Sequence, residues 1–553
     1  MTMHHVRHDP LDPTAFRVLA GGIVILACGL RLYRLGALEL WLDEAASWHW
    51  ATRPDWFARA LSNNTPPLYI WWLRCWMALA GESQIALRLP SAVCGTLFVA
   101  VVLWLGRSMF TPAVGLWAGL WAALMPLHIY YSQEARAYAL LMLVLITTYA
   151  ALWRALQHGT WRAWMLVCAS TTAALYTHYL AILGLLPGIV LVRGAEHPPW
   201  RAYTVAMFAS MFLFLPWLAG SFWIAPHSLQ GTEWIRDAWQ QTPPLLAIPR
   251  SLEVFGLGSQ AHLLPITVKQ FDQPFPASLR WLGIATLLVL ALCAAILGDD
   301  RRTSSRRVPG QSVLWSWLLL PLVALWLISL WKPVYLVGRY DLVALPAYPL
   351  IGGLALAKLQ RTAHWWSAAL IAGVLMIPVA VKLVGYYQIP PQPDLHPTAV
   401  ATADAIAADA NNGDVVVFTD LRALPVLYQL RQRGYAWEDG YCRNDALHRL
   451  FACRMFPLDT EATPAAYDAR RVLNDPDAGR ADAEIIFAML HAPADVVHVV
   501  FGNYAVTRGR LAVATVESLL VGELQRRGFR PIATDLRLGT IAYRRADAAS
   551  LHE

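Results

Sequence analysis

The sequence has few charged side chains. Of its 553 residues only 15% are Asp, Glu, Lys or Arg, while 57% are hydrophobic and the mean hydropathy is +0.42. Soluble domains carry about 25% charged residues, so this scarcity excludes an ordinary soluble globular protein. The net charge of +7 does not indicate a nucleic-acid partner, because the Lys and Arg residues are scattered at the ends of apolar runs and form no basic face.

Metal-binding and redox motifs are also lacking. The seven cysteines include no Cys-x-x-Cys pair, and no other metal-ligand spacing stands out, so we predict no protein metal site and leave only the use of a divalent cation open. Cys442 and Cys453 lie in a polar C-terminal region, and a disulfide between them is plausible if that region is outside the cytoplasm. No small-residue cleavage site follows the first apolar stretch, which we expect to remain as an anchor.

Long apolar runs are what the chain does have. They predict a polytopic α-helical membrane protein with about eleven transmembrane helices. The expected spans are 16–34, 86–107, 112–128, 137–154, 161–177, 179–193, 202–223, 282–298, 313–331, 342–358 and 366–386.

The basic residues between these spans predict the orientation. Arg301, Arg302 and several other basic residues fall on one side, which the positive-inside rule makes cytoplasmic. The N-terminus is then cytoplasmic and the C-terminal region extracytoplasmic, in a cell inner (plasma) membrane. Six positive charges remain on the outer side, where an anionic ligand would account for them: Arg31, Arg34, Arg88, Arg136, Lys332 and Arg339.

Composition divides the chain into two predicted domains. Residues 1–387 form the membrane domain, with outer-face loops at 36–85 and 224–280, and residues 388–553 form a small α/β domain. In the latter we expect a helix over 398–410 and strands over 415–418, 496–501 and 541–544.

Two adjacent carboxylates, Asp43 and Glu44, follow the first span. They are either a solvated pair in a loop or part of a functional site, since acidic groups at the edge of a membrane bundle are costly to desolvate. Local sequence alone does not decide between these alternatives.

Ordered motifs favour the second alternative. They begin with Arg31-Leu-Tyr-Arg-Leu-Gly and Trp41-Leu-Asp-Glu-Ala and continue in the order Thr65-Pro-Pro-Leu-Tyr, Leu87-Arg-Leu-Pro-Ser, Tyr131-Ser-Gln-Glu-Ala-Arg-Ala-Tyr, Tyr176-Thr-His-Tyr, Gly338-Arg-Tyr and Leu345-Pro. Together they resemble the GT-C membrane glycosyltransferases, in the branch of the protein O-mannosyltransferases and the aminoarabinose transferases. Many relatives have His or Lys where this chain has Thr65, which argues against a charged contact there.

The resemblance implies a GT-C-like fold and a polyprenyl-phosphate-linked sugar donor, used on the outer (periplasmic) face in a single inverting displacement. Asp43 matches the position of the family's acidic base, which would take the proton of the attacking acceptor. Glu44 is then a neighbouring partner or a substrate contact. The acceptor, a lipid, glycan or protein, and the identity of the sugar stay open.

The lipid-phosphate leaving group calls for cations, and Arg binds phosphate through two hydrogen bonds. Arg136 and Arg339 are the first candidates, with Tyr340 and Lys332 beside the latter. Arg88 is a further candidate, although an anchor at a span end is the better explanation of its position.

Three other residues are candidates with simple structural explanations. Glu134 could merely pair with Arg136, and His178 is more often a hydrogen-bonded core histidine than a ligand. Tyr69 follows the Pro-Pro pair. A transporter or flippase, or a non-catalytic binder of lipid-linked sugars, is the alternative function. A transporter predicts charges at mid-membrane depth and inverted repeats, neither of which the sequence contains.

Overall fold

A computed structural model gives the structure of the protein. It describes residues 12–62, 65–224, 235–236, 239, 244–258, 311–362, 365–388, 399–409, 414–418, 423–443, 449–457, 496–501, 504–507, 510–513, 521–522 and 524–546. The chain groups into two compact units, one of residues 1–36 and 50–389 and one of residues 37–49 and 390–553.

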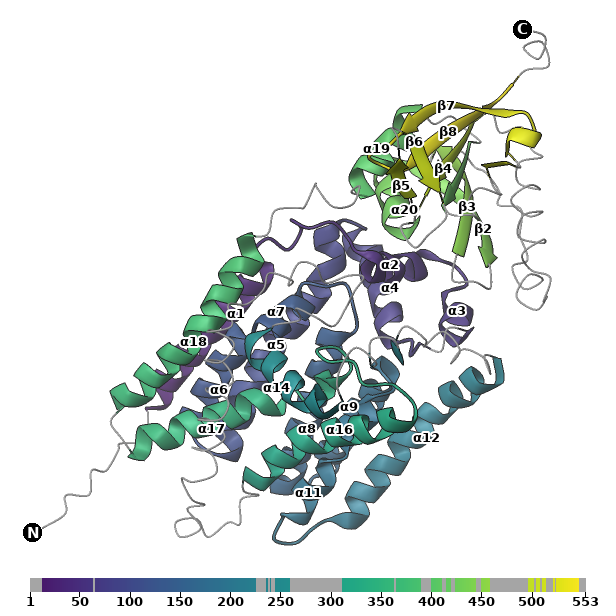
Figure 1. Cartoon of the computed structure of the whole chain (residues 1–553). Coiled ribbons are helices and arrows are strands. Elements are labelled where there is room, and N and C mark those ends of the chain that lie inside the picture. The colour runs from purple at the N-terminus through teal and green to yellow at the C-terminus, as the bar shows by residue number, and fades with distance from the viewer. Residues whose placement is uncertain are drawn as a thin grey trace, which may run out of the picture. The chain divides into compact units, whose positions relative to one another are not determined.

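The first unit is helical (Figure 1). Its helices are α1 (Pro13–Leu32), α3 (Trp56–Ser62), α4 (Leu68–Ala80), α5 (Gln84–Met109), α6 (Pro112–Leu124), α7 (Pro126–Ser132), α8 (Tyr138–His158), α9 (Trp161–Thr177), α10 (Ala181–Leu185), α11 (Gly188–Arg193), α12 (Trp200–Ile224), α14 (Ala247–Leu257), α16 (Gln311–Trp331), α17 (Ala347–Thr362) and α18 (Trp365–Gln388), with the short turns η2 (Pro244–Leu246) and η4 (Asp341–Val343). The helix α2 (Leu42–Thr52) begins in the second unit and ends in the first.

Local sequence accounts for several of these helix ends. The side chains of Ser83, Thr111 and Thr160 accept hydrogen bonds from the backbone N–H three residues ahead, at the starts of α5, α6 and α9. Gly159 ends α8 in the left-handed conformation, with φ 63°. Pro126 opens α7 after a bend of 62° that separates it from α6.

Six helices in the described part of the chain are long and apolar enough to cross a membrane, or seven if α6 and α7 form one broken span. They make the chain a multi-pass membrane protein. The predicted spans 161–177 and 342–358 correspond to α9 and α17, which have only 17 and 16 residues. The predicted span 179–193 is divided between α10 and α11, and 282–298 lies outside the described residues. The number of eleven therefore stays a prediction.

Glycines allow the central helices of this unit to pack closely. A Cβ atom added at Gly353 of α17 would lie 2.6 Å from the Ala118 backbone N of α6, and one at Gly115 of α6 would lie 2.6 Å from the Leu103 carbonyl oxygen of α5. Small residues of this kind let the backbones of membrane helices approach closely. Such packing matters in a bilayer because the hydrophobic effect does not drive helices together there.

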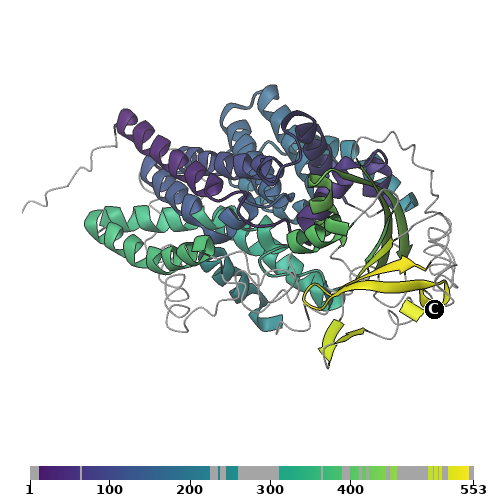
Figure 2. The same ribbon diagram turned by 90° about the horizontal axis from the view of Figure 1, so that it is seen from above.

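The second unit contains an α/β domain. Its six-stranded sheet has the order β2-β3-β1-β4-β8-β7, in which only β1 and β4 are parallel neighbours. The strands are β1 (Val415–Phe418), β2 (Tyr435–Arg443), β3 (Arg449–Pro457), β4 (Val496–Val500), β7 (Phe529–Asp535) and β8 (Thr540–Arg545), and a separate hairpin joins β5 (Tyr504–Thr507) to β6 (Arg510–Val513). Figure 2 shows the long β7 and β8 strands side by side in yellow.

Two helices, α19 (Ala399–Asp409) and α20 (Ala423–Gln432), pack against this sheet. Their buried faces share one apolar core with the inner strands, formed by Ala403, Ile406, Val416, Phe418, Ala423, Val426, Leu427, Leu430 and Val500. The central strands β1 and β4 are buried along their whole length, as expected for a sheet interior.

The strand register does not fit the predicted disulfide. Cys442 of β2 lies opposite Leu450, whereas Cys453 of β3 lies opposite Asp439. An offset of three residues along antiparallel strands separates the two Cα atoms by about 10 Å, which is beyond the reach of a disulfide.

Candidate functional site

The structure brings two of the predicted arginines onto one tyrosine. The guanidinium carbon of Arg136 lies 5.9 Å, and that of Arg339 5.6 Å, from the ring centre of Tyr138. Arg339 Nε also donates a hydrogen bond of 2.6 Å to the Tyr138 hydroxyl. Arg136 lies two residues before α8 and Arg339 two residues before η4, so positive charges far apart in sequence meet at one ring.

Two further predicted residues complete this group. The ring of His178, at the end of α9, lies 6.2 Å from that of Tyr138 and 5.7 Å from that of Tyr340. We call Arg136, Tyr138, His178, Arg339 and Tyr340 the two-arginine cluster. Arg339 is 9% exposed, and Arg136, His178 and Tyr340 are half-buried, so the charges are largely withdrawn from bulk solvent.

The electrostatics of His178 follow from this setting. Burial, and then the positive charges of Arg339 and Arg136, lower the pKa of His178 to about 4. Its Nδ1 accepts a hydrogen bond of 3.2 Å from the Leu180 backbone N–H. His178 is therefore neutral near pH 7, and the net charge of the cluster is carried by the two arginines.

A buried carboxyl group that the sequence did not suggest lies next to this cluster. Asp341 is fully buried, and its Oδ2 accepts a hydrogen bond of 3.0 Å from the Gly338 backbone N–H. Burial raises the pKa of Asp341 to about 7, and hydrogen bonds from Ser251 and Gly338 only partly offset this rise. Tyr131 donates to the Gly338 carbonyl oxygen at 2.6 Å, so both backbone groups of Gly338 are fixed. Asp341 thus fixes the turn that presents Arg339.

The segment that carries Glu134 and Arg136 is fixed from its other end. Gln133 Nε2 donates to the carbonyl oxygens of Arg31 and Tyr33 at 3.1 and 2.8 Å, where α1 ends and its carbonyls lack helical partners. The Tyr386 hydroxyl donates to Gln133 Oε1 at 2.6 Å. Residues 133–136 are thereby tied to both α1 and α18.

Three of the outer-face arginines have structural partners. Arg31 is fully buried and donates to the carbonyl oxygens of Ala122 and Ala123 at 3.2 and 3.3 Å, just before the α6–α7 bend, while its Nη2 lies 2.8 Å from His128 Nδ1. Arg34 donates to the Tyr387 carbonyl oxygen.

Arg88, a predicted donor contact, donates to the Leu35 carbonyl oxygen at 2.9 Å. Contacts of this kind stabilise ends of helices, so an anionic ligand is not needed to explain these three positive charges.

The remaining predicted residues of the first unit lie on other elements. Tyr69 is in the first turn of α4, 3% exposed, with its ring 6.4 Å from that of Trp72. Lys332 follows α16 and is half-buried, where a cation interacts favourably with the helix dipole. Glu134 is 4% exposed, and its carbonyl oxygen accepts from the Arg136 backbone N–H at 2.8 Å.

The carboxylate pair lies in the second unit. Asp43 and Glu44 occupy the first turn of α2, where the helix dipole favours negative charge. Asp43 is half-buried and Glu44 is 1% exposed, so the pair is not a solvated loop. The sequence-based division assigned this segment to the first domain, whereas the structure groups residues 37–49 with the C-terminal residues.

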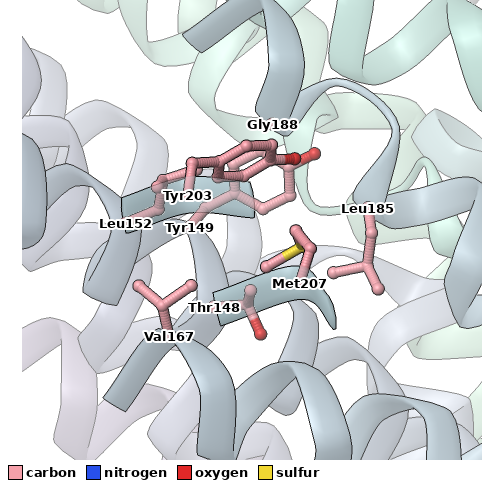
Figure 3. Close-up of a pocket in the computed structure, with 8 residues that line it drawn as sticks. All are labelled: Thr148, Tyr149, Leu152, Val167, Leu185, Gly188, Tyr203 and Met207. Carbon is pink, nitrogen blue, oxygen red and sulfur yellow. The ribbon is translucent and has the colours of Figure 1, made fainter. Parts of the chain in front are cut away.

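A cavity in the first unit lies apart from these residues. Residues of α8, α9, α10, α11 and α12 line a cavity of about 10 Å³, among them Tyr149, Leu152, Tyr203 and Met207 (Figure 3). This is room for about one water molecule. No member of the two-arginine cluster lines it, so we interpret it as a packing void.

In the part of the chain that the structure describes, no group of three or more His, Cys, Asp and Glu side chains could hold a metal ion.

Tyr138, the centre of the two-arginine cluster, was not among the site residues predicted from the sequence. The signal was present, because Tyr138 is the last residue of the Tyr131–Tyr138 motif.

Part of the chain matches a known protein family. Residues 64–220 match the sequence model of the family described as dolichyl-phosphate-mannose-protein mannosyltransferase. A comparison with curated protein sequences gave no match.

Solved structures match over much more of the chain. ArnT from Cupriavidus metallidurans bound to undecaprenyl phosphate matches with a TM-score of 0.58 and 14% identity, over 97% of this chain and 99% of ArnT. Its apo state gives a TM-score of 0.54 at 14% identity, over 96% and 98%.

The Archaeoglobus fulgidus oligosaccharyltransferase tethered with an acceptor peptide matches with a TM-score of 0.47 and 12% identity. The match covers 73% of this chain and 58% of the oligosaccharyltransferase chain. The match to ArnT shows that this chain shares the ArnT fold over nearly its whole length, and residues 64–220 resemble the mannosyltransferase family.

Proposed function

We propose that this protein is a membrane glycosyltransferase that moves one sugar from a polyprenyl-phosphate-linked donor to an acceptor on the outer face of the inner (plasma) membrane. The observation that carries the proposal is the convergence of Arg136 and Arg339 on Tyr138 in a chain with the GT-C fold. Two permanently charged guanidinium groups suit a phosphate, which each can bind through paired hydrogen bonds.

In the proposed reaction the acceptor hydroxyl or amine attacks the anomeric carbon of the sugar. The bond from this carbon to the lipid-phosphate oxygen breaks, and its electron pair stays on the phosphate. Arg136 and Arg339 stabilise the charge that develops there, and Tyr138, bonded to Arg339 Nε, orients that guanidinium.

The acceptor proton goes to Asp43, whose position at the N-terminus of α2 favours the carboxylate form that a base needs. Glu44, buried beside it, contacts the acceptor or orients Asp43. Because the acceptor attacks the face of the anomeric carbon opposite the departing phosphate, this displacement inverts the anomeric configuration. The C-terminal unit is extracytoplasmic and the N-terminus cytoplasmic in this proposal.

The solved relative with undecaprenyl phosphate bound supports this class of donor. The sugar and the acceptor, a lipid, glycan or protein, are set by the rest of the binding site. The use of a divalent cation is an additional proposal that chelation tests.

The test combines binding and transfer. Purified protein in vesicles is given a panel of polyprenyl-phosphate-linked sugars with envelope membranes as acceptor, and released polyprenyl phosphate is measured with and without EDTA. We expect Arg339→Gln and Arg136→Gln each to lower transfer by roughly 10²–10³-fold, the usual cost of removing one preorganised group that stabilises developing charge.

Arg162→Gln is the matched control, because Arg162 lies over the Trp161 ring on α9, outside the two-arginine cluster. Binding of undecaprenyl phosphate should weaken in the two cluster variants only. Equal binding and transfer in all three variants would contradict the proposal.

A further inference from the structure

The segment that carries Asp43 is bound to the C-terminal domain. The chain leaves the first unit after Gly36 and returns to it at Trp50, and residues 37–49 between these points group with residues 390–553. Two contacts, near the two ends of the segment, join it to residues of that domain.

The first contact caps a helix of the domain. Glu39 Oε2 accepts hydrogen bonds from the backbone N–H groups of Ala399 and Val400, at 3.0 and 3.4 Å. These are the first residues of α19, whose N–H groups have no partner within the helix and whose dipole favours a negative charge. The Glu39 carboxylate, 360 positions away in sequence, thus caps the N-terminus of α19.

The second contact is aromatic. Trp48 is 1% exposed and meets the ring of Tyr428 edge-on, with ring centres 5.2 Å apart and planes at 83°. Tyr428, on α20, is also 1% exposed. An edge-to-face pair that is fully buried fixes both position and orientation.

Both contacts, which we call the anchors, lie on one packed pair of helices. Helices α19 and α20 pack on each other through Ala403, Ile406 and Leu427. Between the anchors, the Asp43 carbonyl oxygen accepts from the Ser47 hydroxyl at 3.0 Å, and the Ala45 N–H donates to the Trp41 carbonyl at 3.0 Å. The backbone that carries Asp43 is therefore held on both sides by the C-terminal domain.

We propose that the C-terminal domain positions the catalytic carboxylate, with Glu39, Trp48 and Tyr428 as positioning residues for Asp43. The inference rests on the proposed function for its catalytic consequence. Donor binding depends on arginines of the first unit, whereas the placement of the base depends on the domain. Loss of an anchor should therefore lower kcat and leave the KM for the lipid donor nearly unchanged.

The test uses the full-length protein and two readouts. Hydrogen exchange of the amides of residues 41–49 reports the anchoring without any reaction, and kcat and donor KM report its consequence. In Tyr428→Ala and Glu39→Ala we expect faster exchange in this segment and a fall in kcat of about 10–100-fold, since a misplacement of about 1 Å can cost that much. The donor KM should stay within about twofold of wild type, because uniform donor binding is untouched.

Conservative variants supply the controls. Tyr428→Phe keeps the aromatic edge and Glu39→Gln keeps an acceptor oxygen, so both should restore most of the activity. Ile532→Ala, at a 45% exposed position on β7 of the same domain, should match wild type in both readouts. If Tyr428→Ala lowers the yield of folded protein, Glu39→Ala carries the test alone, because it removes only the acceptor of two N–H groups at the start of α19 and changes no core residue.

Unchanged exchange in residues 41–49 would overturn the inference, and so would faster exchange with unchanged kcat. A parallel rise in donor KM would also overturn it, by showing that the first unit is disturbed. If wild type transfers no sugar at all, the proposed function fails, while the exchange comparison still decides whether the domain holds this segment.

Discussion

Replacement of Arg31 by Met should destabilise the first unit through the α6–α7 bend. Arg31 Nη1 and Nη2 supply hydrogen bonds to the Ala123 and Ala122 carbonyl oxygens, and Nη1 also bonds the Ala27 carbonyl at 2.9 Å. The regular helical partner of the Ala122 carbonyl would be the N–H of residue 126, which is a proline and has none. In Arg31→Met the end of α6 therefore loses donors that no other backbone group replaces.

The magnitude follows from these contacts. Leaving two buried carbonyl groups without a donor costs about 1–3 kcal/mol each. Part of this is offset because a guanidinium no longer has to be desolvated. A net loss of about 2–4 kcal/mol remains, equivalent to a decrease in Tm of about 4–8 °C for a domain of a few hundred residues.

The assay is thermal unfolding of the detergent-solubilised protein. Arg17→Met is the matched control, because Arg17 lies on the same helix and is exposed, and exposed substitutions usually stay within about 0.5 kcal/mol. Arg31→Lys should fall between the two, since one ammonium group cannot reach all the acceptors. An Arg31→Met protein with the Tm of wild type, or an equal loss in Arg17→Met, would refute the reasoning.

Three further outcomes are expected. His178→Asn should leave the pH dependence of transfer unchanged between about pH 5.5 and 8.5, because a pKa of about 4 keeps His178 neutral there. If wild type showed a change in transfer rate near pH 6.5 that His178→Asn lacks, this would be contradicted. Asp341 has a folded-state pKa of about 7, above its unfolded value, so wild type should lose stability as pH rises from about 4 to 7. In Asp341→Asn, unfolding measurements should no longer show this decrease of stability with pH. The same decrease in both proteins would show that Asp341 does not cause it. Gly353→Leu should cost at least about 1–3 kcal/mol or fail to fold, because its side chain would meet the Ala118 backbone, whereas Gly373→Leu, with open space around it, should keep the Tm of wild type; equal Tm values would refute the close helix contact.

Much of the candidate site could be predicted from the sequence because its residues sit in ordered motifs. Arg136, Arg339, His178 and Tyr340 are all in motifs that the sequence singled out, and they converge in the structure. In the C-terminal region, the strands at 415–418, 496–500 and 540–545 and the helix at 399–409 follow from local hydrophobic patterns. Local pattern was sufficient where the element is short and strongly apolar.

What the sequence could not supply depends on distant partners. The carbonyls that Arg31 and Arg88 bind are defined by where other helices end, so both residues resembled ligand contacts when only their charge and side of the membrane were known. The disulfide between Cys442 and Cys453 was predicted from the expected extracytoplasmic location of the domain. The strand register, which the sequence does not reveal, places Cys442 opposite Leu450. The grouping of residues 37–49 with the C-terminal domain involves contacts across hundreds of residues, such as those of Glu39 and Trp48, for which local sequence holds no signal.

The transfer of labelled sugar from polyprenyl phosphate by wild type and Asp43→Asn tests the central claim most directly. Asn is nearly isosteric with Asp and cannot take up the acceptor proton, so we expect wild type to release polyprenyl phosphate and label the acceptor membranes, and Asp43→Asn to lose about 10²–10⁴-fold of that rate. Binding of undecaprenyl phosphate should be the same in both. Full transfer by Asp43→Asn would remove Asp43 as the base, and no transfer by wild type with any donor of the panel would contradict the assignment as a glycosyltransferase.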